Sequence, residues 1–343
     1  MVEKIVGYED VKEGTLFIDL RSPGEFKDST IPGAINIPLF NDGERQEIGT
    51  VYKQESIEKA KQMGVEAVSR KLPEIYKDIV DLKKQYRNMV VFCARGGMRS
   101  GTICSLLNSL GLNVWQLRGG YKAYRSVVNE QLLKIHEEIV YLVLHGFTGS
   151  GKTEILHRLA KRGLDILDLE EAANHRGSLF GSVGMGEKRG QKQFEALVYQ
   201  QLKGRKTNYI FVEAESKRIG NAVLPDYLST SLKKGKHILV EANSEIRAER
   251  IVKEYMQAPN AQEEIVQALD KLKKYLGTKE IEKYLELVND QHYQQVAQEL
   301  LEKYYDPMYN HKQKNYHYQL VIDASDLDKA CQEIENWALA LVK

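Results

Sequence analysis

The chain of 343 residues contains few cysteines and no long apolar run. Its three cysteines, Cys93, Cys104 and Cys331, are odd in number and widely spaced, which argues against a disulfide framework and against a zinc cluster of the usual ligand spacing. No stretch reaches the roughly 20 continuous apolar residues of a membrane span, and residues 1–10 lack an apolar core. We therefore expect a cytoplasmic protein without a membrane partner, in which any special cysteine is a reactive thiol.

The chain also lacks a surplus of either charge, because 49 Lys and Arg stand against 48 Asp and Glu. Nucleic-acid-binding proteins usually carry a basic surplus, so the total by itself disfavours such a partner, although a local basic patch can be hidden in a balanced total. With 42% hydrophobic and 28% charged residues, the composition is that of ordinary globular domains. The length suggests two of them.

Short apolar runs alternate with amphipathic stretches. Buried strands are expected at 15–20, 89–92, 141–144, 209–212, 237–240 and 320–322, and helical periodicity at 75–86, 102–110 and 154–161. This alternation predicts an α/β fold with parallel sheets. We expect a first domain at 1–125, a connecting helix at 126–138 and a second domain at 139–343, with two or three inserted helices at 259–306 that cover the second sheet.

A glycine-rich loop follows the apolar run at 141–144. Residues 146–153 fit the pattern G-x-x-x-x-G-K-[ST], between a strand that ends at His145 and a helix that opens at Glu154. Successive backbone N–H groups curl around an anion in such a loop, while the lysine adds charge and the threonine a hydroxyl for Mg²⁺. The predicted phosphate-binding residues are Gly146, Thr148, Gly149, Ser150, Gly151, Lys152 and Thr153.

The pattern of this loop predicts that a phosphate group is bound, but it does not identify the rest of the ligand. An acid that supports a P-loop usually follows a second apolar strand, and Glu213 fits that position, with Asp168 and Glu170 as alternatives. No second motif identifies an adenine base. ATP, GTP and a plain pyrophosphate ester therefore all stay open as ligands.

A second loop begins with a cysteine directly after the run 89–92. Cys93 is followed by Ala-Arg-Gly-Gly-Met-Arg-Ser and by a helix expected from about Ser100. Converging backbone N–H groups, a helix N-terminus and two guanidinium groups stabilise a thiolate and lower the pKa of a cysteine. Cys93 is therefore the predicted nucleophile, and Arg95, Gly96, Gly97 and Arg99 are predicted to bind a tetrahedral oxyanion.

The residues around this loop resemble a rhodanese domain over about 1–125. The likeness rests on Asp19-Leu20-Arg21-Ser22-Pro23-Gly24-Glu25-Phe26, on Ile31-Pro32-Gly33-Ala34, on the Cys93 loop and on Leu117-Arg118-Gly119-Gly120-Tyr121. The resemblance implies that Cys93 carries sulfur or selenium. Two departures stand out: Thr30 replaces the histidine of many members, and five residues separate Cys93 from Arg99, which suits a substrate with a phosphate-sized group.

A rhodanese domain joined to a P-loop domain resembles the tRNA 2-selenouridine synthase family. Further runs that look like this family are 41–45, 49–53, 168–170, 174–181 and 213–220. The resemblance implies that a wobble 2-thiouridine is alkylated by geranyl diphosphate on the P-loop, and that selenophosphate then replaces the S-geranyl group through Cys93, Arg95 and Arg99. It implies substrates rather than a tightly bound cofactor, with tRNA and a selenophosphate-supplying enzyme as partners and no DNA.

Local charge agrees with an RNA partner. Between Lys188 and Arg218 there are eight Lys and Arg and three Glu, and the predicted tRNA contacts are Lys188, Arg189, Arg205, Lys206, Lys217 and Arg218. A second candidate surface interleaves aromatic and basic groups: Tyr304, Tyr305, Tyr309, His311, Lys312, Lys314, Tyr316, His317 and Tyr318. A solvated basic face and tyrosines in a core are the alternatives.

Two further functions stay open. One is a small-molecule P-loop kinase fused to a sulfurtransferase domain that carries a persulfide, which phosphoryl transfer from ATP would indicate. The other is a module that only senses oxyanions, although a sensor would not need a thiolate between two arginines.

Overall fold

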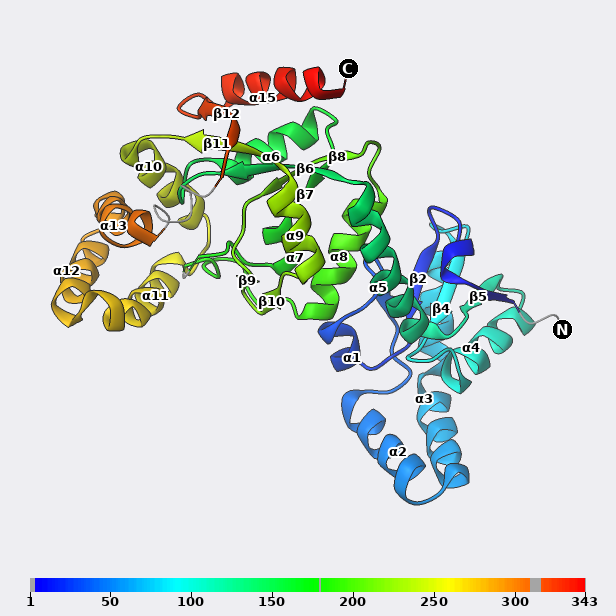
Figure 1. Cartoon of the computed structure of the whole chain (residues 1–343). Coiled ribbons are helices and arrows are strands. Elements are labelled where there is room, and N and C mark those ends of the chain that lie inside the picture. Colours follow the sequence, from blue (N-terminus) through cyan, green and yellow to red (C-terminus); the bar gives the residue numbers. More distant parts are fainter. Residues whose placement is uncertain (1–3, 179, 309–315, 343) are drawn as a thin grey trace. The chain divides into compact units, whose positions relative to one another are not determined.

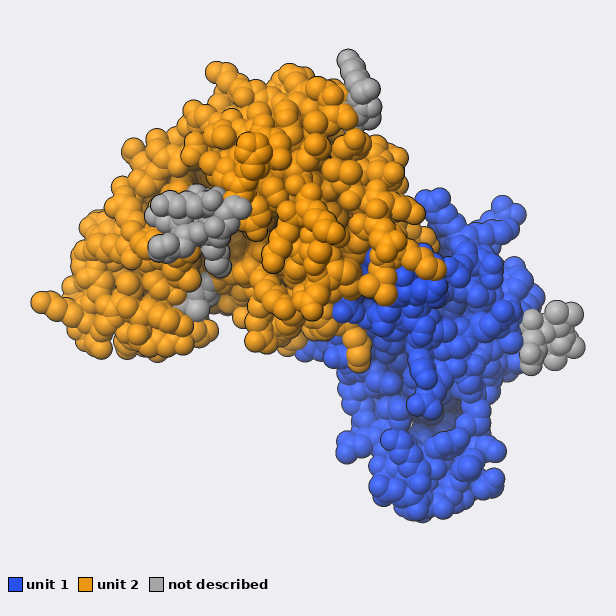
Figure 2. All heavy atoms as spheres, viewed as in Figure 1, with its two compact units in different colours: residues 1–132, 195–197 blue, residues 133–194, 198–343 orange. Residues whose placement is uncertain are grey.

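The computed structural model describes residues 4–178, 180–308 and 316–342. The chain divides into two compact units, coloured separately in Figure 2. Unit 1 comprises Met1–Leu132 with Glu195–Leu197, and unit 2 comprises Leu133–Phe194 with Val198–Lys343. The division falls inside one helix, α5 (Gly120–Glu138), which begins six residues before the expected connecting helix.

Unit 1 contains a five-stranded sheet in the order β1-β5-β4-β2-β3, and every pair is parallel. The strands are β1 (Ile5–Val6), β2 (Leu16–Asp19), β3 (Ile35–Asn36), β4 (Met89–Phe92) and β5 (Val114–Leu117). The accompanying helices are η1 (Tyr8–Asp10), α1 (Pro23–Asp28), α2 (Asp42–Gln54), α3 (Ile57–Lys83) and α4 (Met98–Ser109). All four residues of β4 are buried, so its end is fixed in the middle of the sheet.

Helix α3 is longer than its expected segment at 75–86. Its buried residues Ala60, Ala67, Ile75 and Ile79 recur at helical spacing, and this apolar stripe continues through Pro73. The proline lacks an N–H and would weaken an isolated helix. Packing of the stripe against the sheet core therefore sets the length of α3.

Unit 2 contains a second parallel sheet, in the order β12-β11-β6-β8-β7. Its strands are β6 (Val140–His145), β7 (Ile166–Leu167), β8 (Tyr209–Glu213), β11 (Lys236–Glu241) and β12 (Tyr318–Asp323). Helices α6 (Lys152–Lys161) and α15 (Leu327–Val342) cover one face (Figure 1), where Ile155, Leu159 and Ile334 pack against the strands. The carboxyl end of the central strand β6 lies between those of β8 and β11, which is where such sheets bind ligands.

The remaining elements of unit 2 lie near the carboxyl ends of these strands or on the face of the sheet opposite α6 and α15. They are α7 (Leu169–Ala173), α8 (Gln191–Lys203), the antiparallel pair β9 (Arg218–Ile219) and β10 (Ala222–Val223), α9 (Asp226–Lys234) and α10 (Ser244–Tyr255). No described helix combines the length and the apolar composition that crossing a membrane requires.

The expected helical insertion consists of α11 (Ala261–Leu276), α12 (Thr278–Asn289), α13 (Tyr293–Leu300) and a π-helical turn, η2 (Leu301–Tyr305). These helices are not a solvated cover over the sheet. Leu269, Leu272, Tyr284 and Val288 are fully buried, and together with Phe180 and part of α10 they form a separate apolar core. The expectation of a cover was wrong because each helix buries a continuous apolar stripe against its neighbours.

Candidate functional site

The first site is the loop that joins β4 to α4. Cys93 follows the last residue of β4 and is buried, with 3% of its surface exposed. Helix α4 begins at Met98, two residues earlier than expected. Gly96 has φ +63°, and a Cβ there would lie 2.7 Å from the backbone nitrogen of Gly119. The loop can therefore close tightly over the thiol only with glycine at this position.

Ser100, in the first turn of α4, faces the thiol. The Cys93 Sγ and the Ser100 Oγ are 3.3 Å apart, and the Gln116 side chain donates to the Ser100 Oγ at 3.1 Å. Burial acts to raise the pKa of Cys93, but hydrogen bonds from the Ser100 hydroxyl and from the backbone N–H groups of Ser100 and Arg95, with the charge of Arg99, lower it below the ordinary value. Such a thiol is more readily converted to the reactive thiolate.

The two loop arginines act differently on this thiol. Arg99 is mostly buried and forms an ion pair with Glu25 at 3.3 Å, so its guanidinium is held beside the loop. Arg95 lowers the pKa of Cys93 through its backbone N–H, while its side chain is exposed. Glu25, at the third position of α1, was not singled out from the sequence, because the pairing spans 74 residues.

Thr30 belongs to a buried polar network. Its hydroxyl donates to Asp19 Oδ2 at 2.9 Å, and Arg21 donates to the same carboxylate at 2.6 Å and to the carbonyl of Ser29. Asp19 is fully buried, so its charge is compensated by these donors. Threonine at this position therefore completes the hydrogen bonding of Asp19.

Removing the Ser100 hydroxyl should raise the pKa of the Cys93 thiol. In Ser100→Ala the thiolate loses its side-chain donor while burial continues to oppose ionisation. The pH dependence of iodoacetamide alkylation in the Cys104→Ala background should then move to higher pH. Ser105→Ala, exposed on the same helix, is the control. An unchanged profile for Ser100→Ala would contradict this account of the thiol.

The second site is the loop between β6 and α6. It runs from Gly146 to Gly151, and the helix begins at Lys152, two residues before the expected start. Lys152 Nζ donates to the carbonyls of Gly146 at 3.1 Å and Phe147 at 3.3 Å. Gly149 has φ +77°, and a Cβ there would lie 2.7 Å from the carbonyl oxygen of Arg247. The backbone N–H groups at the start of α6 form a site for an anion.

Two arginines of α10 hold this loop from outside. Arg247 Nε donates to the carbonyl of Thr148 at 2.9 Å, while its other nitrogens pair with Asp306 at 2.6 and 3.0 Å. Arg250 donates to the carbonyl of Ser150 at 2.9 Å. Neither arginine was found by sequence reasoning, because each contact spans about 100 residues and no local pattern marks it.

Three carboxylates gather beside the loop. Oxygens of Glu170, Glu213 and Glu215 lie within 4.8 Å of one another. Burial raises the pKa of Glu213 to about 7, with Lys152 and a hydrogen bond from Thr153 opposing the rise and Glu215 adding to it. Burial likewise raises the pKa of Glu170 and of Glu215. Glu215 was missed because it lies two residues beyond the strand, outside the usual motif position.

Asp168, the alternative acid, has a different environment. Its side chain accepts from the backbone N–H of Glu171 at 2.7 Å and caps α7. Its other carboxylate oxygen lies 2.6 Å from His157 Nε2. These contacts commit Asp168 to the start of α7 and to His157, so Glu213 and Glu170 are the predicted acids that the fold brings together.

Two family models match the chain, and each match contains one of the two sites. The family model for the tRNA 2-selenouridine synthase AAA domain matches residues 139–339, and the rhodanese-like domain model matches 8–127. The chain belongs to the tRNA 2-selenouridine synthase family. A tRNA 2-selenouridine synthase of Pseudomonas syringae pv. tomato is 33% identical over 87% of this chain and 88% of its own length. That of Nitrosomonas europaea is 32% identical over 94% and 82%.

A solved structure is also similar to part of this synthase. The N-terminal domain of a protein of Clostridium difficile 630, described as ATP/GTP binding, is 47% identical. The match covers 36% of the present chain and 98% of that domain, with a TM-score of 0.36.

The six basic residues expected at the tRNA surface of the synthase do not form one patch. Arg205 and Lys206 precede β8, and Arg205 pairs with Glu138 at 2.7 Å. Lys217 and Arg218 follow β8 at its carboxyl end, and Arg189 donates to the Glu171 carbonyl in α7 after β7. The length of β8, roughly 13 Å at about 3.3 Å per residue, separates the two groups. Arg205 and Lys206 therefore lie away from the P-loop edge, and the role of the six residues as tRNA contacts stays a prediction.

The aromatic stretch is also divided. Tyr309, His311, Lys312 and Lys314 lie outside the described residues. Tyr305 is 8% exposed and belongs to the helical core, so its expected role in an RNA surface is wrong. The ring of Tyr316 packs against His145 at 4.5 Å and His237 at 4.6 Å between centroids, so it lies against the neighbouring strands β6 and β11.

The buried carboxyl group of Glu213 should make the stability of unit 2 depend on pH. Its pKa is raised from 4.5 to about 7 in the folded protein, so the folded state binds the proton more tightly and stability falls as pH rises through this range. In chelator-containing buffer, Glu213→Gln should raise the Tm by at least about 3 °C near pH 8, with a smaller gain near pH 5. Glu249→Gln, exposed on α10, should change neither. A Tm of Glu213→Gln below that of wild type near pH 8 would contradict the assignment.

Proposed function

We propose that this synthase converts a wobble 2-thiouridine of tRNA into 2-selenouridine in two steps, one at each site. Two observations support this function together: a thiol with a lowered pKa in the rhodanese-like unit and a P-loop without an evident base-recognition motif in the other. The substrates in the proposal are geranyl diphosphate and selenophosphate. Membership of the synthase family supports tRNA as the acceptor.

In the proposed first step the sulfur of 2-thiouridine attacks C1 of geranyl diphosphate. A carbon–sulfur bond forms, the bond from C1 to the diphosphate oxygen breaks, and pyrophosphate leaves with the electron pair. Lys152 and the backbone N–H groups at the start of α6 face the charge that develops on pyrophosphate. For this they exchange the present contacts of Lys152 with Gly146 and Phe147 for contacts with the ligand.

The carboxylates of Glu170, Glu213 and Glu215 suit Mg²⁺ in this step. Oxygen ligands are what Mg²⁺ prefers, and Glu213 Oε1 is buried without a hydrogen-bond partner among the described residues. Bound there or through the Thr153 hydroxyl, Mg²⁺ would supply positive charge to the diphosphate. The three carboxylates would then be held as anions despite their raised pKa values.

In the proposed second step selenium replaces the S-geranyl group at C2 of the base. The balanced exchange consumes selenophosphate and water and releases geranylthiol and phosphate. The Cys93 thiolate attacks C2 of the base, so that a carbon–sulfur bond to the protein forms and geranylthiolate leaves. The selenium of selenophosphate then attacks C2 and displaces the Cys93 thiolate, and water cleaves the selenium–phosphorus bond to release phosphate. Arg99 with the N–H groups of Arg95, Gly96 and Gly97 holds the tetrahedral anion. Lys188, Arg189, Lys217 and Arg218 are proposed contacts for the tRNA phosphates.

Mass spectrometry of wobble nucleosides tests this function directly. The purified chain is incubated with tRNA that carries 2-thiouridine, and geranyl diphosphate and selenophosphate are omitted in turn. We expect S-geranyl-2-thiouridine without selenophosphate and 2-selenouridine with both substrates. Unchanged 2-thiouridine under every condition would contradict the function, and consumption of ATP with phosphorylation of a metabolite would favour the kinase instead.

A further inference from the structure

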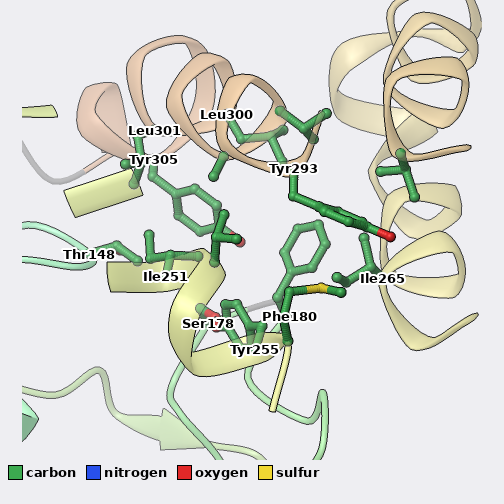
Figure 3. A pocket seen from close by; sticks show the side chains of 15 residues that line it. Thr148, Ser178, Phe180, Ile251, Tyr255, Ile265, Tyr293, Leu300, Leu301 and Tyr305 are labelled. Carbon is green, nitrogen blue, oxygen red and sulfur yellow. Dashed lines mark hydrogen bonds between the residues drawn. The ribbon is translucent and has the colours of Figure 1, made fainter. Parts of the chain in front are cut away.

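An apolar cavity lies beside the P-loop in unit 2. It is lined by residues of α10, α11, α12, α13 and η2 and by the segment around Phe180, and Figure 3 shows the rings of Phe180, Tyr293 and Tyr305 around it. Its volume is about 60 Å³. The separate core of the helical insertion therefore contains space next to the loop that binds phosphate.

The cavity and the P-loop share a wall. Thr148 of the loop lines the cavity, and the carbonyl of the same residue accepts from Arg247 Nε at 2.9 Å. Ile251, one helical turn after Arg247 on α10, also lines the cavity. A single helix thus fixes both the phosphate loop and the adjoining apolar wall, so one ligand can reach both.

The lining selects against a nucleotide base. Among the described lining residues, oxygen or nitrogen occurs only in the side chains of Thr148, Ser178 and three tyrosines. Ser178 Oγ and the Tyr255 hydroxyl lie 3.5 Å apart, and the Tyr293 hydroxyl donates to Gln262 at 3.2 Å. A base would need directional polar partners. An apolar tail gains from burial without them.

We propose that this cavity is the tail-binding subsite for the prenyl chain of the diphosphate held on the P-loop. The inference rests on the proposed function and adds a determinant of chain length to it. Its wall is made by Phe180, Ile251, Tyr255, Val296, Leu300 and Tyr305. The occupant is an amphiphile with a diphosphate head and a short hydrocarbon tail, rather than a nucleoside triphosphate.

The size of the cavity sets an expected tail length. At about 10–15 Å³ for each water-sized group, 60 Å³ accommodates roughly five such groups, which is one five-carbon isoprene unit. The first isoprene unit of a ten-carbon tail then lies along Thr148, and the second fills the cavity. A five-carbon tail then leaves most of the cavity unfilled, and a fifteen-carbon tail exceeds its volume.

The test measures alkylation of 2-thiouridine tRNA with dimethylallyl, geranyl and farnesyl diphosphate. Wild type should prefer geranyl diphosphate in kcat/KM by at least about tenfold over either neighbour. Ala297→Phe, which places a ring in the cavity, should lower kcat/KM for geranyl diphosphate at least about tenfold. Leu300→Ala, which enlarges it, should shift preference toward farnesyl diphosphate. Gln294→Phe, exposed on the same helix, should match wild type.

Two further measurements distinguish a loss of tail binding from a general loss of activity. Inhibition by inorganic pyrophosphate, which has a head and no tail, should be the same in Ala297→Phe as in wild type. Conversion of S-geranyl tRNA by selenophosphate should also continue, which shows that the variant is folded. If wild type alkylates and the cavity variants keep its chain-length preference, the subsite is wrong and the function stands. If wild type uses no prenyl diphosphate, both are wrong.

Discussion

Replacing Cys93 by alanine should lower incorporation of selenium by about 10³-fold or more, as expected when a nucleophile is removed. Cys93→Ala should leave alkylation of 2-thiouridine within about twofold of wild type. The reason is that the thiol belongs to the rhodanese-like unit, whereas the P-loop, which is the proposed site of the diphosphate, belongs to the other. S-geranyl-2-thiouridine should therefore accumulate, and nucleoside mass spectrometry measures both products.

Cys104→Ala is the matched control for this experiment. Cys104 is also buried in unit 1 and free of disulfides, but burial raises its pKa above the ordinary value. Its Sγ lies 3.4 Å from the carbonyl of Val114, so it serves as a packed thiol. Normal formation of 2-selenouridine by Cys93→Ala, or its loss in a folded Cys104→Ala, would overturn the role of Cys93.

Replacing Lys152 by alanine should have the opposite effect. Lys152 is the cation at the start of α6 and, in the proposed mechanism, meets the charge of the departing pyrophosphate. Removing one such group from a transition state typically costs a factor of about 10²–10³, so alkylation by geranyl diphosphate should fall by that amount. Conversion of tRNA that already carries S-geranyl-2-thiouridine should continue at nearly the wild-type rate. Initial rates with each tRNA substrate measure the difference.

Lys161→Ala provides the control for loss of a positive charge. Lys161 is exposed at the end of the same helix, far from the loop along the helix axis. Its removal should leave both steps unchanged. An alkylation rate for Lys152→Ala equal to that of wild type would show that the P-loop is not the site of the diphosphate.

The fold could be predicted from the sequence where strands are long and apolar. The runs at 89–92 and 209–212 coincide with β4 and β8 almost residue for residue. The two-residue strands β1 and β3 were missed, because two residues carry no periodic signal. Pairing with a neighbour defines them instead, as Ile5 with Gln116 and Ile35 with Ile18.

The residues of the two candidate sites also differ in whether the sequence could predict them. Cys93 and Lys152 lie in contiguous motifs, so their positions could be predicted from local sequence. Glu25 and Arg247 could not, because each reaches its site from a distant part of the chain. The ion pair of Arg205 could not be predicted either, since its partner Glu138 lies 67 residues away along the chain.

The most direct test of the two-site account supplies the intermediate itself. Purified tRNA bearing S-geranyl-2-thiouridine is given with selenophosphate to wild type, to Lys152→Ala and to Cys93→Ala, and 2-selenouridine is quantified. Product is expected from wild type and from Lys152→Ala, and none is expected from Cys93→Ala. Equal product from Cys93→Ala, or its loss from a folded Lys152→Ala, would contradict the assignment of selenium transfer to the thiol and of alkylation to the P-loop.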